Sequence, residues 1–278
     1  MRLAVAGGTG VMGTHIVEQA RAAGHQVVII SRRHGVDLTT GAGLDRALDG
    51  VDVVIDVSNV VTLSEKRSVD FFGTVTRTLN EAERKAGVAH HLVLSIVGVD
   101  RVDFGYYRGK LRQEELALSS GVPATVLRAT QFFEFPGQQL AQMPGPIAVV
   151  PKMVSQPIAA SEVATELLRL AEGPALGLAP DIAGPEVLEI AAMARRLIRH
   201  HRASSKIRAG GSDGERADGS GGKHADGSGG KRAGEDKRWV LSLPLPGSAG
   251  RAMASGGLLP TGPGPRGTIT FESWLAER

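Results

Sequence analysis

Glycines cluster near the start of the chain, between an apolar run that opens at Leu3 and a stretch of helix-forming composition over 14–23. Gly8, Gly10 and Gly13 fit the G-x-G-x-x-G spacing. In this spacing one glycine makes a tight turn, one lets backbone N–H groups approach a pyrophosphate, and one lets the helix pack on the strand. An ordinary glycine-rich turn is the alternative, but the strand–turn–helix context favours a dinucleotide site. The predicted cofactor contacts in this turn are Gly7, Gly8, Thr9, Gly10, Val11, Met12 and Gly13.

Two arginines follow directly after a second apolar run, which predicts a buried strand over 26–31. At this point an acidic side chain binds the ribose 2′-hydroxyl of NAD, whereas an arginine accommodates the 2′-phosphate of NADP. Arg32 and Arg33 therefore favour NADP, with NAD still allowed, and two solvated surface arginines are the alternative. The cofactor contacts predicted on later elements are Asp37, Leu38, Val57, Ser58, Asn59, Lys110 and Thr130.

Tyr106 and Lys110 are four residues apart, so their side chains share one face of a predicted helix, and Ser95 ends the predicted strand before it. Together the three resemble the catalytic set of the short-chain dehydrogenase/reductase superfamily. The resemblance implies that Lys110 lowers the pKa of Tyr106 and reaches the nicotinamide ribose. It also implies that Tyr106 transfers a proton to or from a carbonyl or alcohol oxygen that Ser95 hydrogen-bonds. The alternatives are a structural tyrosine beside a solvated lysine, or Tyr107 as the acid.

Strands alternate with helices along the first half of the chain, which predicts an α/β fold with a doubly wound parallel sheet. The run over 51–58 is apolar enough to predict a strand that is buried on both faces. Because open α/β sheets bind ligands at the carboxyl ends of their strands, the candidate cofactor and catalytic residues are expected to converge at that edge. The other predicted strands are 36–38, 91–95 and 124–130, and the other predicted helices are 44–48, 65–85 and 106–119.

The composition argues against several classes of function. The chain of 278 residues has no cysteine, which excludes disulfides, thiolate nucleophiles and cysteine-ligated metals. Its net charge of +3 is small and its basic residues are scattered, so no nucleic-acid partner is expected. His200 and His201 lack a third ligand, so no metal is expected. Neither a signal peptide nor a membrane span is predicted, and the expected location is the cytoplasm.

A wider resemblance covers residues 1–202, which are similar to the NmrA-like NAD(P)-binding proteins, atypical members of the same superfamily. The segments that carry it are the glycine turn, 106–110, 128–133, 156–159 with the helix from Ser161, and 183–186. It implies an NAD(P)-binding Rossmann domain over 1–143 and a small C-terminal substrate lobe over 144–278. That family includes reductases, isomerases and regulators that bind NADP without turnover, so the resemblance supports the cofactor more strongly than the reaction.

The second half of the chain is expected to contain shorter elements. Residues 203–237 hold an eight-residue repeat with almost no apolar side chains, which predicts a disordered insertion. Two G-S-G-G-K strings in it follow no strand and do not fit the phosphate-loop spacing. The predicted elements are small strands at 147–150 and 153–158, helices at 162–170 and 186–201, and a terminal helix within 268–275 whose Phe271, Trp274 and Leu275 can dock on the lobe.

These features lead to competing functional hypotheses. The first is an NADP(H)-dependent oxidoreductase that acts on a small carbonyl, alcohol or quinone-like molecule. The second is a redox-sensing regulator that holds NADP without turnover, and the third is a structural subunit that binds NADP for stability. The predicted catalytic residues favour the enzyme, whereas the lack of the usual short-chain asparagine and of a substrate-specific motif keeps the regulator open. The expected partner is a small-molecule substrate, and the expected assembly is a monomer or a homodimer.

Overall fold

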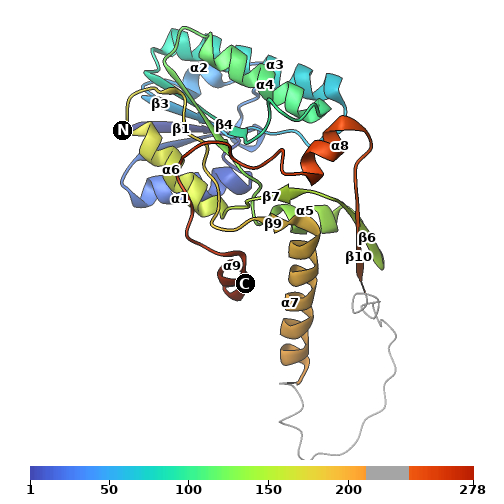
Figure 1. Ribbon diagram of the computed structural model, residues 1–278. Helices are drawn as coiled ribbons and strands as arrows, with labels where there is room; N and C mark the ends of the chain where they lie inside the picture. Colours follow the sequence, from blue (N-terminus) through green and yellow to red (C-terminus); the bar gives the residue numbers. More distant parts are fainter. Residues whose placement is uncertain (211–237) are drawn as a thin grey trace, which may run out of the picture.

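Short apolar runs, each bounded by glycine or polar turns, form the strands of a parallel sheet at the centre of the protein (Figure 1). The computed structural model describes residues 1–210 and 238–278, with their side chains except those of 205–210. The six strands follow the order β2-β1-β3-β4-β5-β8, and Val5 of β1 lies opposite Ile29 and Ile55 on its neighbours. Their bounds are β1 Arg2–Ala6, β2 Gln26–Ile30, β3 Val53–Asp56, β4 His90–Ile96, β5 Ala124–Ala129 and β8 Gly177–Leu178.

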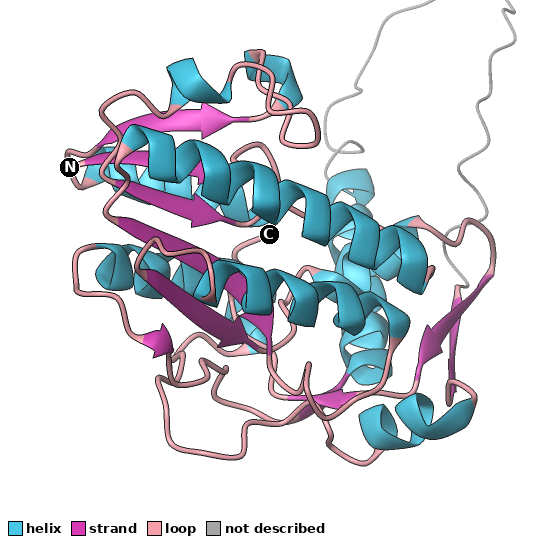
Figure 2. Ribbon diagram, turned by 90° about the horizontal axis from the view of Figure 1, so that it is seen from above, coloured by secondary structure: helices cyan, strands magenta, loops and turns pink. Residues whose placement is uncertain are grey.

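Helices cover both faces of this sheet (Figure 2). Leu3 and Val5 face one layer while Ala4 and Ala6 face the other, as the alternation of side chains along a strand requires. One layer contains α1 (Val11–Ala22) and α6 (Ala160–Ala171), and the other contains α2 (Leu44–Ala47), α3 (Glu65–Ala86) and α4 (Gly105–Leu118). The doubly wound α/β fold predicted from the sequence is therefore confirmed.

Helices α3 and α4 approach closely because glycines of α4 face α3. A Cβ on Gly109 would lie 2.1 Å from the Ser68 hydroxyl oxygen, and a Cβ on Gly105 would lie 2.9 Å from the Cβ of Glu65. The Ser68 hydroxyl also donates to the Tyr106 carbonyl oxygen at 2.9 Å. This packing fixes the first turns of α4, which carry the predicted catalytic tyrosine and lysine.

The strand predicted at 36–38 does not form, and that prediction is wrong. The Asp37 carboxylate accepts from the backbone N–H and the hydroxyl of Thr39, at 2.8 and 2.7 Å, and this local turn leads the chain away from the sheet. Strand β2 is consequently the edge of the sheet, and its residue Ile29 is only partly buried instead of fully buried as predicted. A hollow of about 360 Å³ beside this edge is lined in part by Val36.

A smaller lobe is built from segments that are far apart in the sequence. Its core joins Phe133 and Val240 with the terminal helix, whose Phe271, Trp274 and Leu275 are buried, so the predicted docking of that helix is confirmed. Between β7 and β9 the chain returns to the main sheet to form α6 and β8. The elements of the lobe are α5 Phe135–Ala141, β6 Ile147–Pro151, β7 Val154–Ser155, β9 Leu188–Glu189, α7 Ile190–Gly210, β10 Trp239–Leu243, α8 Gly247–Ala254 and α9 Phe271–Ala276.

Helix α7 extends beyond the rest of the lobe (Figure 1). Because it continues to Gly210, residues 203–210 are helical, and the prediction that the disordered insertion begins at 203 is wrong for this part. The rest of that prediction concerns 211–237, which contains the repeat and both G-S-G-G-K strings and lies outside the described residues.

Candidate cofactor and active site

The glycine turn joins β1 to α1 and lies against the end of β3. Gly7 has a φ of +79°, a conformation that side chains other than glycine rarely adopt, and a Cβ there would lie 2.8 Å from the Val57 carbonyl oxygen. A Cβ on Gly13 would lie 2.3 Å from the Gly7 carbonyl oxygen. Both positions therefore require glycine, the first for the turn and the second for the packing of α1 on it.

The N-terminus of α1 is exposed at this turn. Gly10 is its N-cap and provides no capping side chain, so the first N–H groups of the helix are left for an outside acceptor. A Cβ on Gly10 would approach only the Gly7 carbonyl oxygen, at 3.4 Å, so packing does not require this glycine. The N–H groups and the helix dipole together favour an anion such as a pyrophosphate.

A polar group without a partner borders the same space. Ser58 is buried, and its hydroxyl oxygen has no hydrogen-bond partner among the described residues. Its Cα would lie 3.0 Å from a Cβ on Gly7, and its N–H donates to the Asp56 carboxylate at 2.9 Å. A ligand that reaches the glycine turn would supply this hydroxyl with a partner, so the residues present fit a dinucleotide.

Arg32 and Arg33 lie in a short 3₁₀ turn (Arg32–His34) directly after β2; Arg32 and Arg33 are both exposed. Hydrogen bonds from Thr39 lower the pKa of the Asp37 carboxyl, and the nearby Arg32 guanidinium lowers it further. The expected adenosine end therefore offers guanidiniums for a 2′-phosphate and an ionised carboxylate for a ribose hydroxyl.

The other predicted cofactor contacts differ in exposure. Thr9 and Val11 are exposed, Leu38 and Val57 are partly buried, and Gly8 and Met12 are buried in the packing of the turn. Thr130 is buried at the end of β5, and its hydroxyl donates to the Gln156 carbonyl oxygen at 2.6 Å. Thr130 therefore already has a partner within the protein.

Tyr106 opens α4 and reaches the loop after β3. Its hydroxyl donates to the Asn59 side-chain oxygen at 2.6 Å, and its ring contacts that of Phe72 edge to face. Burial raises its pKa above the ordinary value, because the phenolate loses its hydration. Tyr107 points instead into the core of the lobe, where its ring lies 5.4 Å from that of Phe104. Of the two tyrosines, Tyr106 is thus the one beside the predicted cofactor loop.

Lys110 is buried beneath Tyr106 on the same helix. Its ammonium donates to the Leu94 carbonyl oxygen at 2.6 Å and to the Gln113 side-chain oxygen at 2.5 Å, and it lies 4.7 Å from the centre of the Phe72 ring. The Gln113 amide in turn donates to the Asp56 carboxylate at 2.7 Å. Burial lowers the pKa of Lys110 to about 8, although Asp56 opposes this change. The predictions missed Asp56 and Gln113; the one available signal was a carboxylate inside the apolar run of β3.

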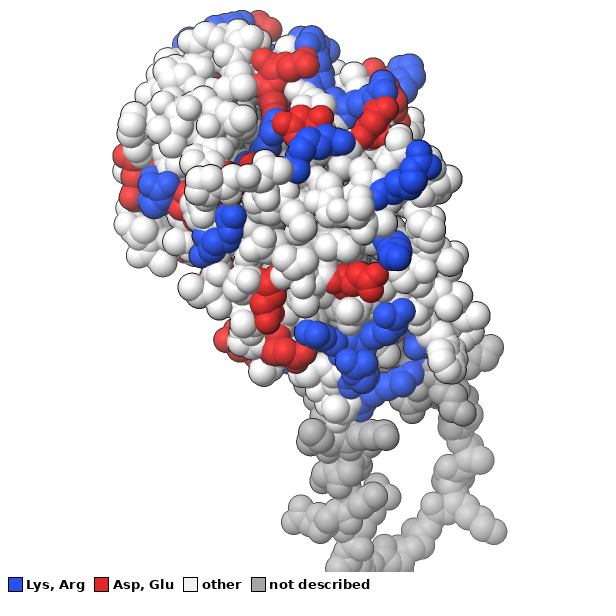
Figure 3. Space-filling model, in the orientation of Figure 1, with Lys and Arg blue, Asp and Glu red and all other residues white. Residues whose placement is uncertain are grey.

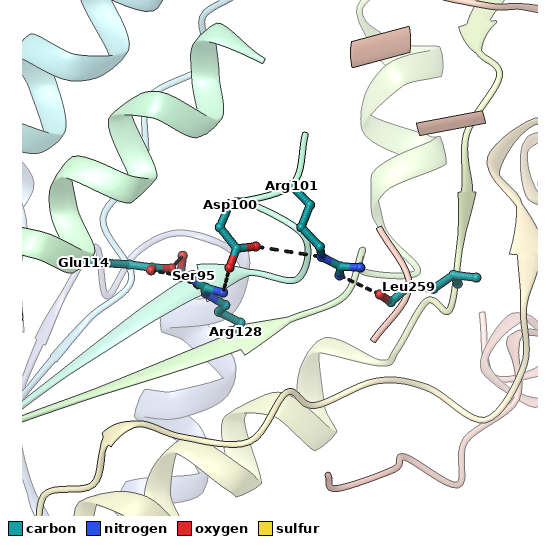
Figure 4. Close-up of polar contacts among 6 residues, drawn as sticks. All are labelled: Ser95, Asp100, Arg101, Glu114, Arg128 and Leu259. Carbon is teal, nitrogen blue, oxygen red and sulfur yellow. Dashed lines mark hydrogen bonds and ion pairs between the residues drawn. The ribbon is translucent and has the colours of Figure 1, made fainter. Parts of the chain in front are cut away.

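Ser95 belongs to a separate polar network at the end of β4 (Figure 4). Its hydroxyl donates to Glu114, which Arg128 holds through two hydrogen bonds of 3.0 and 2.7 Å. Arg128 also donates to Asp100 at 2.7 Å. Burial disfavours the charged guanidinium, but these carboxylates outweigh it and raise the pKa of Arg128. Next to this network, Arg101 donates to the Leu259 carbonyl oxygen at 2.7 Å and so connects it to the lobe.

The three predicted catalytic side chains therefore lie at one end of the sheet, each with its own partner. Tyr106 bonds Asn59, Lys110 bonds Gln113 and the end of β4, and Ser95 bonds Glu114. Among the described residues no hydrogen bond joins these three to one another. Within the same residues, no group of three or more histidine or acidic side chains is placed to hold a metal, and no helix is long and apolar enough to cross a membrane.

Residues 3–98 match the model of a protein family described as the NAD dependent epimerase/dehydratase family. No curated protein matches the chain. The fold is shared with solved structures of low sequence identity, among them enzymes whose names refer to nucleotide sugars.

MoeE5 in complex with UDP-glucuronic acid and NAD is 18% identical, with 99% of this chain and 97% of that chain covered and a TM-score of 0.63. UDP-N-acetylglucosamine 4-epimerase from Bacillus cereus is 19% identical, with 70% and 79% covered and a TM-score of 0.58. UDP-glucose 4-epimerase from Thermus thermophilus, in complex with NAD, is 18% identical, with 72% and 83% covered and a TM-score of 0.57. Identities of this size show the fold alone.

Proposed function

We propose that the protein binds a nicotinamide dinucleotide, NADP in preference to NAD, at the carboxyl ends of β1, β2 and β3. The observation that carries this proposal is the exposed N-terminus of α1 at a turn where Gly7 and Gly13 tolerate no side chain. The match of residues 3–98 to an NAD-dependent family, and the NAD bound in two of the similar structures, support it. The turn would hold the pyrophosphate, and Arg32 and Arg33 would hold the 2′-phosphate.

The bound dinucleotide would supply a hydride donor or acceptor, and residues of this chain would handle the proton. Tyr106 donates or accepts it at a carbonyl or alcohol oxygen, after its hydroxyl has exchanged Asn59 for the substrate. Lys110, one turn further along α4, provides the positive charge that favours the tyrosinate. Ser95 hydrogen-bonds the same oxygen once its hydroxyl has left Glu114.

The proposed reaction is the oxidation or reduction of a small alcohol, carbonyl or quinone-like compound. The names of the similar structures indicate another substrate class, nucleotide sugars. The two differ in redox balance, because reduction of a carbonyl consumes NADPH whereas epimerisation of a sugar leaves no net change in the dinucleotide.

Two assays on the full chain separate these substrate classes. Absorbance of NADPH is followed with a panel of aldehydes, ketones and quinones, and UDP-glucose incubated with NAD is analysed by chromatography. Consumption of NADPH supports the oxidoreductase, and conversion of the sugar without NADH accumulation supports the nucleotide-sugar enzyme. No change in either assay contradicts turnover.

One observation favours a second function, binding of NADP without turnover. Tyr106, Lys110 and Ser95 all have partners within the protein, so the catalytic groups are not aimed at an open substrate site. A sensor of this kind would bind NADPH and NADP with different affinities and consume neither. Calorimetric titration with both forms, together with the assays above, tests this function.

A further inference from the structure

Strands β6 and β10 form a separate sheet of two strands at the outer side of the lobe (Figure 1). Within the described residues they pair only with each other, in parallel. A sheet of two strands is marginally stable unless one of its faces packs against something apolar. The facing pairs include Ile147 with Trp239, Val149 with Leu241 and Pro151 with Leu243.

The two faces of this sheet have different environments. The inner face contributes Ala148, Val150 and Val240 to the core of the lobe. The opposite face, called here the outer β6/β10 face, is apolar and reaches solvent: Trp239 is 70% exposed and Leu241 is 47% exposed. Its members are Ile147, Val149, Pro151, Trp239, Leu241 and Leu243. A contiguous apolar face of this kind indicates a contact site.

The chain's own undescribed segment has the wrong composition to cover this face. Residues 211–237 enter the chain directly before Arg238 and β10. They consist of glycine, serine, alanine, histidine and charged residues, without any valine, isoleucine, leucine, methionine or aromatic side chain. Such side chains cannot remove large apolar groups from water by hydrophobic contact. The cover must therefore come from another molecule.

Charge restricts that molecule further. The outer β6/β10 face has no charged side chain, so an acidic or basic partner would gain nothing there. The arginines of α7 lie behind the sheet, because α7 contacts its inner face and Arg195 donates to the Val240 carbonyl oxygen. Figure 3 shows Lys and Arg side chains gathered over the region of α7. Two copies in contact through their outer faces would keep these positive charges apart.

We infer that a second copy of this chain covers the outer β6/β10 face, with the two sheets stacked about a two-fold axis. A two-fold contact is self-complementary, so each apolar face meets the same face of the other copy. The patch amounts to about 500 Å² per copy, near the upper end of what a monomer leaves exposed. This is less than the roughly 800 Å² per partner of a standard interface, so the dimer is expected to dissociate on dilution.

Sedimentation velocity of the full chain over a range of concentrations tests this inference. We expect a monomer–dimer equilibrium whose dissociation constant rises by about 100-fold or more in Leu241→Lys, because the variant buries an unpaired charge in the contact. The matched control is Leu63→Lys, which changes a leucine that is 85% exposed in the loop before α3 and should leave the equilibrium unchanged. Thermal melting should be unchanged in both variants, because both side chains are exposed.

The absence of cysteine from the chain allows a second, geometric measurement. Under mild oxidation Leu241→Cys should give a disulfide-linked dimer, and Leu63→Cys should not. A chain that is monomeric at every concentration, or a dimer that persists in Leu241→Lys, would overturn the inference. Dimerisation that appears only when 211–237 is replaced by a short linker would also overturn it, because the chain's own segment would then be the cover.

Discussion

At the glycine turn, the first N–H groups of α1 and the Ser58 hydroxyl lack partners, whereas along the same edge of the sheet Tyr106, Lys110 and Ser95 all have them. The first region can receive an anionic ligand without rearrangement. In the second, Tyr106 must leave Asn59 before it can reach a substrate oxygen. The comparison shows that the structure supports dinucleotide binding more directly than it supports turnover.

The difference between the two regions has a physical origin in burial. The glycine turn is short of side chains, so its backbone remains accessible. Lys110 carries a charge into the protein interior, where Gln113 and the Leu94 carbonyl compensate it and Asp56 closes the network. Removing one member of such a buried set costs about 3–5 kcal/mol. The groups proposed for catalysis therefore also stabilise the fold, and experiments must separate the two roles.

The largest expected effect is on catalysis. Tyr106→Phe removes only the hydroxyl that bonds Asn59, so the fold and NADPH affinity should be retained. Turnover should fall by about 10²–10⁴, the usual worth of a positioned proton donor. Steady-state rates and calorimetric titration of the same preparation measure both properties.

Tyr107→Phe is the matched control, because that ring packs in the lobe and is not beside the cofactor loop. A wild-type rate in Tyr106→Phe together with a large loss in Tyr107→Phe would exchange the two assignments. Wild-type rates in both variants would remove the tyrosine from the mechanism.

The next effect separates the charge of Lys110 from its packing. Burial lowers its pKa to about 8 from the ordinary 10.5, so between these values the unfolded chain binds more protons than the folded chain. The free energy of unfolding therefore gains a contribution that rises with pH across this window, by up to about 3 kcal/mol, and Lys110→Met should lack it. Urea unfolding of both proteins at about pH 7 and about pH 10 measures the difference. Parallel changes in the two proteins would show that the ammonium does not bear this burial cost.

How far the sequence predicts the structure depends on whether the decisive contact is local. The strands of the main sheet and the turn at Gly7 follow from short apolar runs and a positive φ, which neighbouring residues determine. The missing strand at 36–38 depends on one side-chain turn at Asp37, which competes with pairing to β2. Apolar periodicity contains no signal for such a turn.

The candidate active site was less predictable, because its contacts join elements distant in sequence. Spacing placed Tyr106 and Lys110 on one helix face. It did not show that Lys110 would meet Phe72 of α3 and, through Gln113, Asp56 of β3. These contacts depend on how closely α3 and α4 pack. The catalytic assignment consequently remains a prediction, and the polar networks around it are findings of the structure.

The smallest effect concerns cofactor choice. Replacing both arginines, Arg32→Ala with Arg33→Ala, should weaken NADPH binding about tenfold or more, because charge-assisted contacts to the 2′-phosphate are each worth about 1.5–3 kcal/mol. NADH affinity should be unchanged, and the exposure of both side chains leaves stability unaffected. Titration with the two dinucleotides measures the ratio. Equal affinities in the parent protein would show that the ionised Asp37, not the arginines, dominates the adenosine end.

The most direct test of dinucleotide binding at the glycine turn is calorimetric titration of the full chain and of Gly10→Ala with NADPH. A methyl group on Gly10 approaches only the Gly7 carbonyl oxygen, at 3.4 Å, so folding should be retained. The same methyl group stands beside the N–H groups offered to the pyrophosphate, so affinity should fall at least about tenfold. Gly262→Ala, where a Cβ meets nothing within 4 Å, is the control and should bind as the parent does. We expect one bound NADPH per chain, weakened only in Gly10→Ala; no binding by the parent, or equal binding by both variants, would contradict the proposed site.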